Sequence, residues 1–282
     1  MNSRRRLIVR KTATYLLVGL FVFVLAAPFA WMMITTFKAD VDLYRPGNNP
    51  FLFNVPPTLD HLRLLFFETA YATFLRNSAL IGVLVVVITL IFSVPAAYSL
   101  ARLVGDWGER AGIIMFLVYL IPPTLLFIPM FRMVVALQLN NTIWSLIVVY
   151  PTITIPFSTW ILMGFFKSIP RDLEEAAMVD GYSRLMAFFK VVMPLSWSGM
   201  IAIIVFTFTL TLHEFIYALT FISSSAQRPL SVGVPLELVR GDVFYWQSLM
   251  AASVIVAIPV GIVYNFFLDR LVEGFTMGAV KG

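Results

Sequence analysis

Long stretches without a charged side chain constrain this chain more than any other feature of its sequence. Charged residues make up only 12% of it, about half of the share found in soluble domains. Each uncharged stretch can cross roughly 30 Å of hydrocarbon as a helix that rises about 1.5 Å per residue. Polar residues interrupt the longest stretch, 133–166, so its span is predicted over 142–166. We therefore predict an all-α polytopic membrane protein with six transmembrane helices, over 12–37, 77–101, 111–131, 142–166, 191–212 and 243–268.

The distribution of basic residues predicts the orientation of these spans. The first apolar stretch is about twice as long as the core of a signal peptide and lacks a small-residue cleavage site, so we expect a retained helix. With the N-terminus inside, 13 basic residues fall in cytoplasmic segments and 7 fall outside. The positive-inside rule then predicts that both termini are cytoplasmic. The same bias accounts for the net charge of +5, and no basic-aromatic stripe indicates a nucleic-acid partner.

The predicted cytoplasmic segment 167–198 carries the most charge outside the N-terminal tail. Asp172 followed by Glu175 forms a capping-box pattern, and Gly181 can adopt the left-handed conformation that ends a helix. These signals predict a helix over about 173–180. A helix of about two turns is marginal in water, so we expect a docking partner to stabilise it.

A second short helix is predicted over 183–192, before Pro194 stops it. Its apolar side chains recur at helical spacing, at Leu185, Phe188, Phe189 and Val192. An apolar stripe on a cytoplasmic segment requires a cover. That cover is either a partner protein or the chain's own helical bundle.

The spacing within this segment resembles a known motif. Glu175-Ala176-Ala177, Gly181, Val191 and Met193-Pro194 follow one another as in the EAA loop of permease subunits in bacterial binding-protein-dependent ATP-binding-cassette importers. Valine and methionine replace the usual isoleucine and leucine and preserve apolar volume. Residues 74–78, 96–102 and 278–282 resemble the carbohydrate branch, specifically its maltose-type second permease subunit. One departure is Leu212-His213-Glu214-Phe215, where that branch usually has Trp-Asn-Glu-Phe.

The resemblance implies the type I ABC importer permease fold, also called MetI-like, over about 72–282. It implies three regions: 1–71 with the cytoplasmic tail, first helix and periplasmic loop; 72–270 with the permease core and the EAA loop at 167–198; and 271–282 as a cytoplasmic tail. In this family the EAA helix sits in a groove of the nucleotide-binding subunit. The coupling residues implied here are Asp172, Glu175, Ala176, Ala177, Asp180, Gly181 and Pro194. For Glu175, capping of its own helix is an equally open interpretation.

The implied function is import of a carbohydrate or sugar derivative across the bacterial inner membrane by alternating access. Because the sequence has no Walker A loop, zincin spacing, nucleophile elbow or cysteine, we expect no catalytic residue, metal or cofactor in this chain. ATP and Mg are expected on the partner ATPase. The implied partners are a homologous permease, a cytoplasmic ABC ATPase dimer, a periplasmic or extracellular solute-binding protein, and membrane lipid.

Polar and aromatic residues in the predicted spans are candidates for a substrate pathway. They are Asn77, Tyr150, Thr154, His213, Glu214 and Tyr217. An ionisable side chain within a span is costly unless it faces water, protein or substrate. Glu214 is therefore either a pathway residue or an anchor between helices, and His213 either a substrate contact or a packing residue. Pro151 and Pro156 are expected to bend the fourth span.

Other functions remain open from the sequence. Related permeases carry glycerophosphodiesters or polyols, so these are the alternative substrates. An ATP-independent secondary transporter usually shows an internal repeat with interrupted helices in matching halves, and none is visible here. A structural membrane scaffold would leave the capped, charged helix in 167–198 unexplained.

Overall fold

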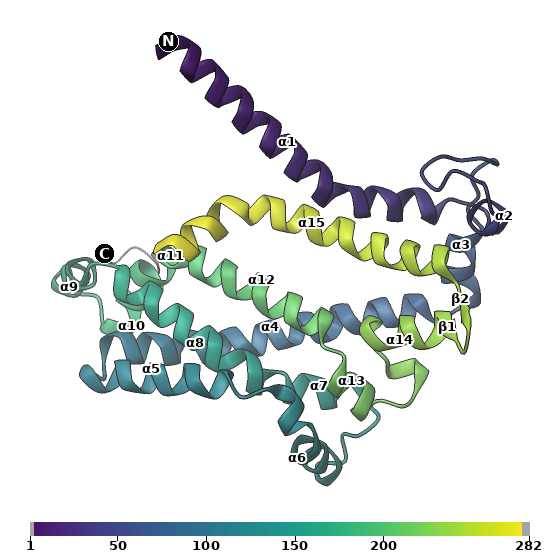
Figure 1. The fold of residues 1–282 in the computed structure, drawn as a ribbon. Coiled ribbons are helices and arrows are strands. Elements are labelled where there is room, and N and C mark those ends of the chain that lie inside the picture. Colours follow the sequence, from purple (N-terminus) through teal and green to yellow (C-terminus); the bar gives the residue numbers. More distant parts are fainter. Residues whose placement is uncertain (1–2, 278–282) are drawn as a thin grey trace. The chain divides into compact units, whose positions relative to one another are not determined.

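The computed structural model describes residues 3–277, which form two compact units (Figure 1). Unit 1 comprises 1–69 and 234–259, and unit 2 comprises 70–233 and 260–282. The residues 278–282, whose sequence resembles the carbohydrate branch, lie outside the described part of the chain.

Helices make up nearly all of the regular structure. Unit 1 contains α1 (Ser3–Thr36), α2 (Asp40–Tyr44), α3 (Asp60–Arg63), a π-helix (Leu64–Glu68), β1 (Val239–Arg240) and β2 (Val243–Phe244). Unit 2 contains α4 (Tyr71–Arg102), α5 (Asp106–Tyr119), α6 (Pro123–Ala136), α7 (Ile143–Val149), α8 (Pro151–Ser168), α9 (Arg171–Val179), α10 (Arg184–Ala187), a π-helix (Phe188–Val192), α11 (Met193–Leu195), α12 (Trp197–His213), α13 (Ile216–Phe221) and a 3-10 turn (Ser225–Gln227). Helices α14 (Leu230–Leu238) and α15 (Trp246–Met277) contribute to both units. The strands pair as an antiparallel hairpin, with Val239 opposite Phe244.

Four helical segments are long and apolar enough to cross a membrane, and the number rises to six if each of two bent helix pairs is one span. The four segments are Arg10–Thr36, Tyr71–Arg102, Ile143–Ser168 and Trp246–Leu268. They correspond to the first, second, fourth and sixth spans predicted from the sequence. Pro151 begins α8 directly after Tyr150, and Pro156 lies inside that helix.

The two remaining predicted spans are each built from a bent pair of helices. Helices α5 and α6 meet at 88°, so 111–131 does not form one rod. The break falls at Pro122 and Pro123, because a proline disfavours helical geometry in the residue before it and cannot donate to the preceding turn. Pro123 then occupies the first turn of α6, where no such donor is required.

The second bent pair, Arg184–Leu195 and α12, meets at 72°, so the span predicted over 191–212 begins only at Trp197. The prediction that Pro194 stops the preceding helix at 192 is wrong. It occupies the first turn of α11, where a missing amide hydrogen is tolerated, and the helix ends at Leu195.

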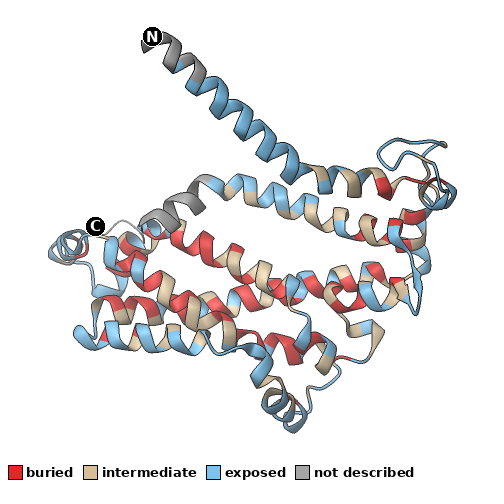
Figure 2. Ribbon diagram, in the orientation of Figure 1, coloured by how far each residue is buried: buried red, intermediate tan, exposed pale blue. Residues whose placement is uncertain are grey.

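Unit 2 is built around α4, which packs against α8 and α12 (Figure 1). Its buried residues, coloured red along the ribbon in Figure 2, form two main clusters. One joins Ile81 and Val85 of α4 to Tyr150, Tyr217 and Phe221. The other joins the C-terminal half of α4 to α8, α12 and the π-helix Phe188–Val192. Helix α4 therefore links the segment around α9 and α10 to the cluster around Tyr150.

In unit 1, a buried ion pair organises the loop that follows α1. Lys38 and Asp42 have fully buried side chains, and Lys38 Nζ lies 3.2 Å from Asp42 Oδ2. Lys38 also donates to the carbonyls of Asn49 and Leu52, while Asn54 donates to both oxygens of Asp42. Burial alone raises the pKa of Asp42, but the hydrogen bonds from Asn54 and Lys38 together outweigh it and lower that pKa. The loop is thus held by satisfied buried charges.

Candidate functional site

The predicted coupling helix is present as α9, and its C-terminus is capped as the sequence indicated. Gly181 has φ +96°, in the left-handed region. Its amide donates to the carbonyl of Met178 at 3.1 Å, and the amide of Tyr182 donates to the carbonyl of Ala177 at 3.0 Å. These two bonds form a Schellman motif. The prediction of a left-handed glycine at this helix end is confirmed.

The predicted N-terminal capping box is wrong. Helix α9 starts at Arg171, its N-cap is Pro170, and no side chain accepts a capping hydrogen bond there. Asp172 instead lies in the first turn, where a negative charge favours the helix dipole. Proline at the boundary moves the start of the helix ahead of the position that the Asp172–Glu175 spacing indicated.

A buried polar cluster anchors α9 to the end of α4. Glu174 is 6% exposed. Its Oε1 accepts a hydrogen bond from the Tyr98 hydroxyl, and its Oε2 lies 3.7 Å from Arg102 Nε. Arg102 also donates from a terminal nitrogen to the carbonyl of Ile169 at 2.6 Å. We call Tyr98, Arg102 and Glu174 the α4–α9 cluster.

The sequence interpretation missed this cluster. Glu174 stands beside Glu175, and only the three-dimensional structure separates the buried carboxylate from the exposed one. A usable signal was the presence of Tyr98 and Arg102 at the charged end of an otherwise apolar span, since ionisable groups in spans require partners.

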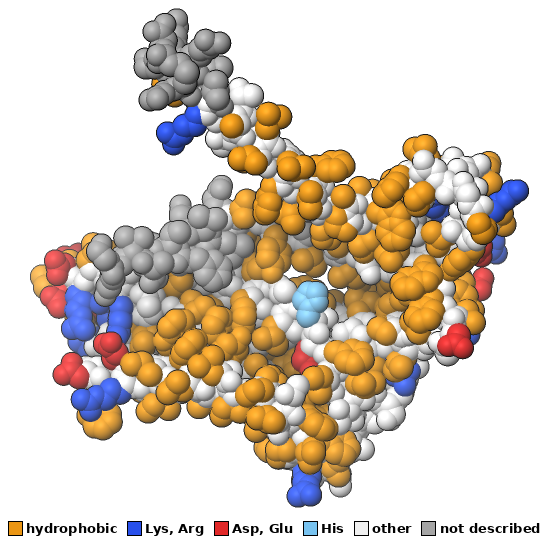
Figure 3. All heavy atoms as spheres, in the orientation of Figure 1, with side chains coloured by type: hydrophobic (Ala, Val, Ile, Leu, Met, Phe, Trp, Pro, Cys, Tyr) orange, Lys and Arg blue, Asp and Glu red, His pale blue; other side chains and the backbone are white. Residues whose placement is uncertain are grey.

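The opposite side of α9 is exposed. Glu175, Ala176, Asp172 and Asp180 are exposed, whereas Ala177 is buried. Apolar side chains also remain uncovered on α9 and on the segment after it: Leu173, Val179, Tyr182, Leu185, Met186 and Phe189. We call these six side chains the apolar docking face. Figure 3 shows charged side chains gathered at the end of unit 2 that carries α9 and α10, while the rest of the face drawn is mainly hydrophobic.

The second short helix divides its apolar stripe between two environments. Phe188 and Val192 are buried and belong to the chain's own core, where the Phe188 ring lies 4.4 Å from that of Tyr98. Leu185 and Phe189 are exposed. The stripe therefore packs in part on its own bundle and in part remains open to a partner.

Three of the predicted pathway residues come together at the junction of α12 and α13. The Tyr150 hydroxyl donates to Glu214 Oε2 at 2.7 Å. The carboxylate also accepts the backbone amides of Tyr217 at 2.9 Å and Ala218 at 3.1 Å. Glu214 thus caps the N-terminus of α13, where helical amides stabilise an anion. The Tyr217 hydroxyl donates to the carbonyl of Pro123 at 2.9 Å.

The other predicted pathway residues lie apart from this junction or are exposed. Thr154 is buried and shares a hydrogen bond of 2.6 Å with Thr89. Asn77 is buried, and its amide donates to two carbonyls in the segment 226–228. His213, at the end of α12, is exposed. Among residues 3–277, no three metal-ligating side chains lie close enough to hold an ion.

The sequence matches an established family. Residues 69–276 fit the model of the binding-protein-dependent transport system inner membrane component. The chain belongs to this family. It is therefore a multi-pass inner-membrane permease of a binding-protein-dependent transport system.

Relatives of this permease are similar over most of their length. The sulfoquinovosyl glycerol transport system permease protein SmoH of Agrobacterium fabrum is 37% identical, over 90% of this chain and 88% of the relative. The trehalose/maltose transport system permease protein MalG of Thermococcus litoralis is 33% identical, over 90% and 91%. The diacetylchitobiose uptake system permease protein DasC of Streptomyces coelicolor is 32% identical, over 96% and 95%.

A solved structure supports the fold. A chain of a bacterial ABC transporter involved in the import of the acidic polysaccharide alginate has a TM-score of 0.80 and 21% identity, with 96% of this permease and 99% of that chain covered. The type I importer permease fold expected from the EAA loop is thereby confirmed.

Proposed function

We propose that this permease imports a carbohydrate by alternating access, driven by ATP hydrolysis on a separate subunit. The proposal rests on family membership and on the substrates for which the relatives are named. These substrates are sulfoquinovosyl glycerol, trehalose or maltose, and diacetylchitobiose, and all of them are glycosides. The apolar docking face beside the capped α9 supports coupling to a cytoplasmic partner. ATP and Mg belong to that partner, and the permease itself performs no bond-breaking chemistry.

The proposed partners are a homologous permease, an ABC ATPase dimer and a solute-binding protein. The apolar docking face supports an ATPase partner, because exposed apolar side chains beside charges are typical of protein interfaces. Asp172, Glu175, Ala176 and Asp180 lie on the exposed side of α9, within reach of such a partner. Helix α1 supports a second partner, since an 18-residue apolar stretch within its span has no residue buried in this chain. Lipid or the homologous permease would cover it.

Purification of the tagged permease from its native membrane tests these partners. We expect a second permease and an ABC ATPase to co-isolate with it in fixed ratio. A chain that purifies alone, and that transports in vesicles without ATP, would contradict the proposal in favour of a secondary transporter.

We propose that both termini and residues 167–198 are cytoplasmic, on the basis of the basic-residue bias. Because the sequence has no cysteine, single substitutions suffice to test this. Asp60→Cys and Arg184→Cys both change exposed residues. The test uses cells whose outer membrane is permeabilised and whose inner membrane is intact. A maleimide that cannot cross the inner membrane should label position 60 and leave position 184 unlabelled until that membrane is opened. Labelling of position 184 in intact cells would overturn the orientation.

For Glu214 we propose an anchoring role, because its carboxylate already accepts three hydrogen bonds within the chain. Glu214→Gln keeps an acceptor but loses the charge, which weakens each of these bonds by about half. The yield of assembled complex should fall, and the apparent affinity of the surviving complex for substrate should stay unchanged. Concentration-dependent uptake and assembly are measured on one preparation. A weaker affinity at normal yield would make Glu214 a substrate contact instead.

A further inference from the structure

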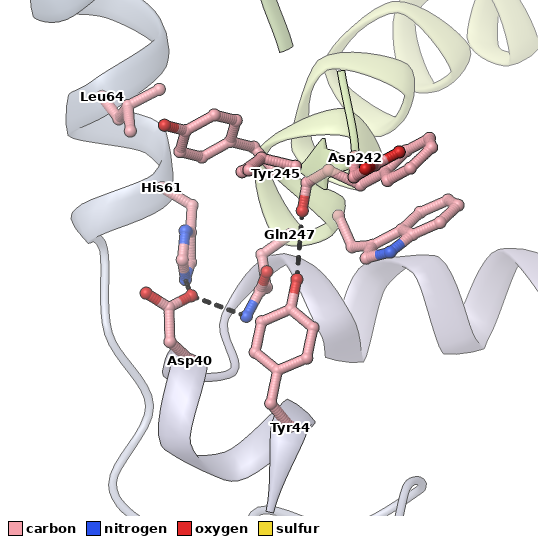
Figure 4. Close-up of a pocket in the computed structure, with 10 residues that line it drawn as sticks. Asp40, Tyr44, His61, Leu64, Asp242, Tyr245 and Gln247 are labelled. Carbon is pink, nitrogen blue, oxygen red and sulfur yellow. Dashed lines mark hydrogen bonds and ion pairs between the residues drawn. The ribbon is translucent and has the colours of Figure 1, made fainter. Parts of the chain in front are cut away.

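Unit 1 contains a cavity of about 430 Å³ that lies outside the coupling and pathway residues. Its walls come from α2, from α3 and the π-helix after it, from the β2 segment, and from the first turn of α15 (Figure 4). Cavities of this size commonly hold small ligands, especially where apolar walls carry a few placed polar groups. Its residues come from the loop after the first predicted span, from the end of the loop before the last predicted span, and from the first residues of that last span. The predicted orientation places all of these on the outer side.

Two hydrogen bonds between distant parts of the sequence hold the walls together. The Tyr44 hydroxyl donates to the carbonyl of Phe244 at 3.1 Å, and Gln247 Nε2 donates to Asp40 Oδ1 at 2.9 Å. Gln247 is 1% exposed, whereas the Asp40 side chain is 73% exposed. Figure 4 shows Asp40 between His61 and Gln247. A buried amide therefore orients a carboxylate that is itself open to solvent.

Four aromatic side chains line the same cavity and remain partly exposed: Tyr44, Phe244, Tyr245 and Trp246. The rings of Phe244 and Trp246 stack with their centroids 5.1 Å apart. Aromatic faces pack against the apolar C–H face of a pyranose ring, and carboxylates accept hydrogen bonds from its hydroxyls. The cavity offers both kinds of contact.

The charge of the lining distinguishes among sugars. Asp40 and Asp242 are both carboxylates, and no lysine or arginine lines the cavity in the described part of the chain. The side chain of Lys38 is buried, pairs with Asp42 and donates its hydrogen bonds to loop carbonyls, so it does not line the cavity. His61 also lines the cavity, with its Nε2 3.9 Å from Asp40 Oδ1. With His61 neutral, the two carboxylates give the cavity a net negative charge, which disfavours uronates and sulfonated sugars by like-charge repulsion.

We infer that this cavity is a subsite for a neutral saccharide, with a pyranose ring on the aromatic side chains and its hydroxyls on Asp40 and Asp242. The inference rests on the proposed carbohydrate function and narrows its substrate class. The competing explanation is that these aromatic side chains only anchor the start of α15 at the membrane surface, as tryptophan and tyrosine commonly do.

Saturation-transfer NMR on the whole complex in nanodiscs, without the binding protein, separates these explanations. The probes are maltotriose, which is neutral, and trigalacturonate, which is acidic. The variants are Trp246→Ala and Asp40→Asn, with Trp107→Ala and Asp60→Asn as matched controls, because both control residues are exposed and lie outside the cavity.

We expect wild type and both controls to bind maltotriose and not trigalacturonate. Each cavity variant should bind maltotriose at least about tenfold more weakly, since a charge-assisted hydrogen bond or a stacked ring is lost. Three results would each overturn the subsite. Wild type does not bind maltotriose, both cavity variants bind maltotriose as wild type does, or wild type binds trigalacturonate as well as maltotriose. If one of these results is found and the reconstituted transporter still takes up saccharide, the subsite alone is rejected and the proposed function stands.

Discussion

Replacing Glu174 with alanine is expected to abolish most ATP-driven uptake while the permease still inserts into the membrane. The change leaves Arg102 buried without its carboxylate and removes the acceptor of the Tyr98 hydroxyl. Breaking one side of a buried ion pair typically costs about 3–5 kcal/mol. Helix α9 is then no longer held to the end of α4, so movement of the ATPase does not reach the bundle. Uptake should be lost while ATP hydrolysis by the complex continues.

The matched control is Glu109→Ala. Glu109 is 70% exposed and lies 3.4 Å from Lys167, and exposed ion pairs contribute at most about 1 kcal/mol. This variant should transport almost as wild type. Glu174→Gln should be intermediate, because an amide still accepts from Tyr98 but carries no charge for Arg102. Equal uptake by the Glu174→Ala and Glu109→Ala variants would remove the α4–α9 cluster from the coupling path.

Gly181→Val is expected to reduce uptake several-fold without loss of membrane insertion. The φ of +96° places Gly181 in a region that a β-branched residue adopts only at a cost of about 1–2 kcal/mol. Among the residues that the structure describes, no atom beyond the adjoining residues lies within 4 Å of an added Cβ, so backbone strain, rather than an internal clash, is the cause. The Schellman motif that ends α9 would loosen, and with it the geometry of the coupling segment.

Gly47→Val provides a closely matched control for that variant. Gly47 has the same φ of +96° and the same open surroundings, but it lies in the loop of unit 1. It carries the same strain at a place without a coupling role, so its uptake should remain near that of wild type. If both variants lose uptake equally, general destabilisation explains the loss and the coupling assignment of Gly181 fails.

Composition predicted the membrane-spanning character of this chain but not the shape of every span. A window without charges measures apolar length, and it cannot distinguish a straight helix from two helices that meet at 88°. The Pro122-Pro123 pair is the sequence signal for the break between α5 and α6. The hairpin of β1 and β2 was missed as well, although Gly241-Asp242 is a two-residue turn signal.

Local signals predicted the end of α9 correctly because a left-handed glycine is a property of the nearby backbone. The α4–α9 cluster could not be predicted in the same way, because the burial of Glu174 depends on residues 72 to 76 positions earlier in the sequence. Three predicted pathway residues, Tyr150, Glu214 and Tyr217, do lie together. Their hydrogen bonds inside the chain favour an anchoring role over direct contact with substrate.

Uptake into proteoliposomes tests the central claim most directly. The permease is reconstituted with its co-isolated permease and ATPase, with ATP enclosed in the lumen and the solute-binding protein outside. Our account predicts uptake of a neutral saccharide only when both ATP and the binding protein are present. Saccharide uptake that continues without ATP and follows an imposed ion gradient would contradict it.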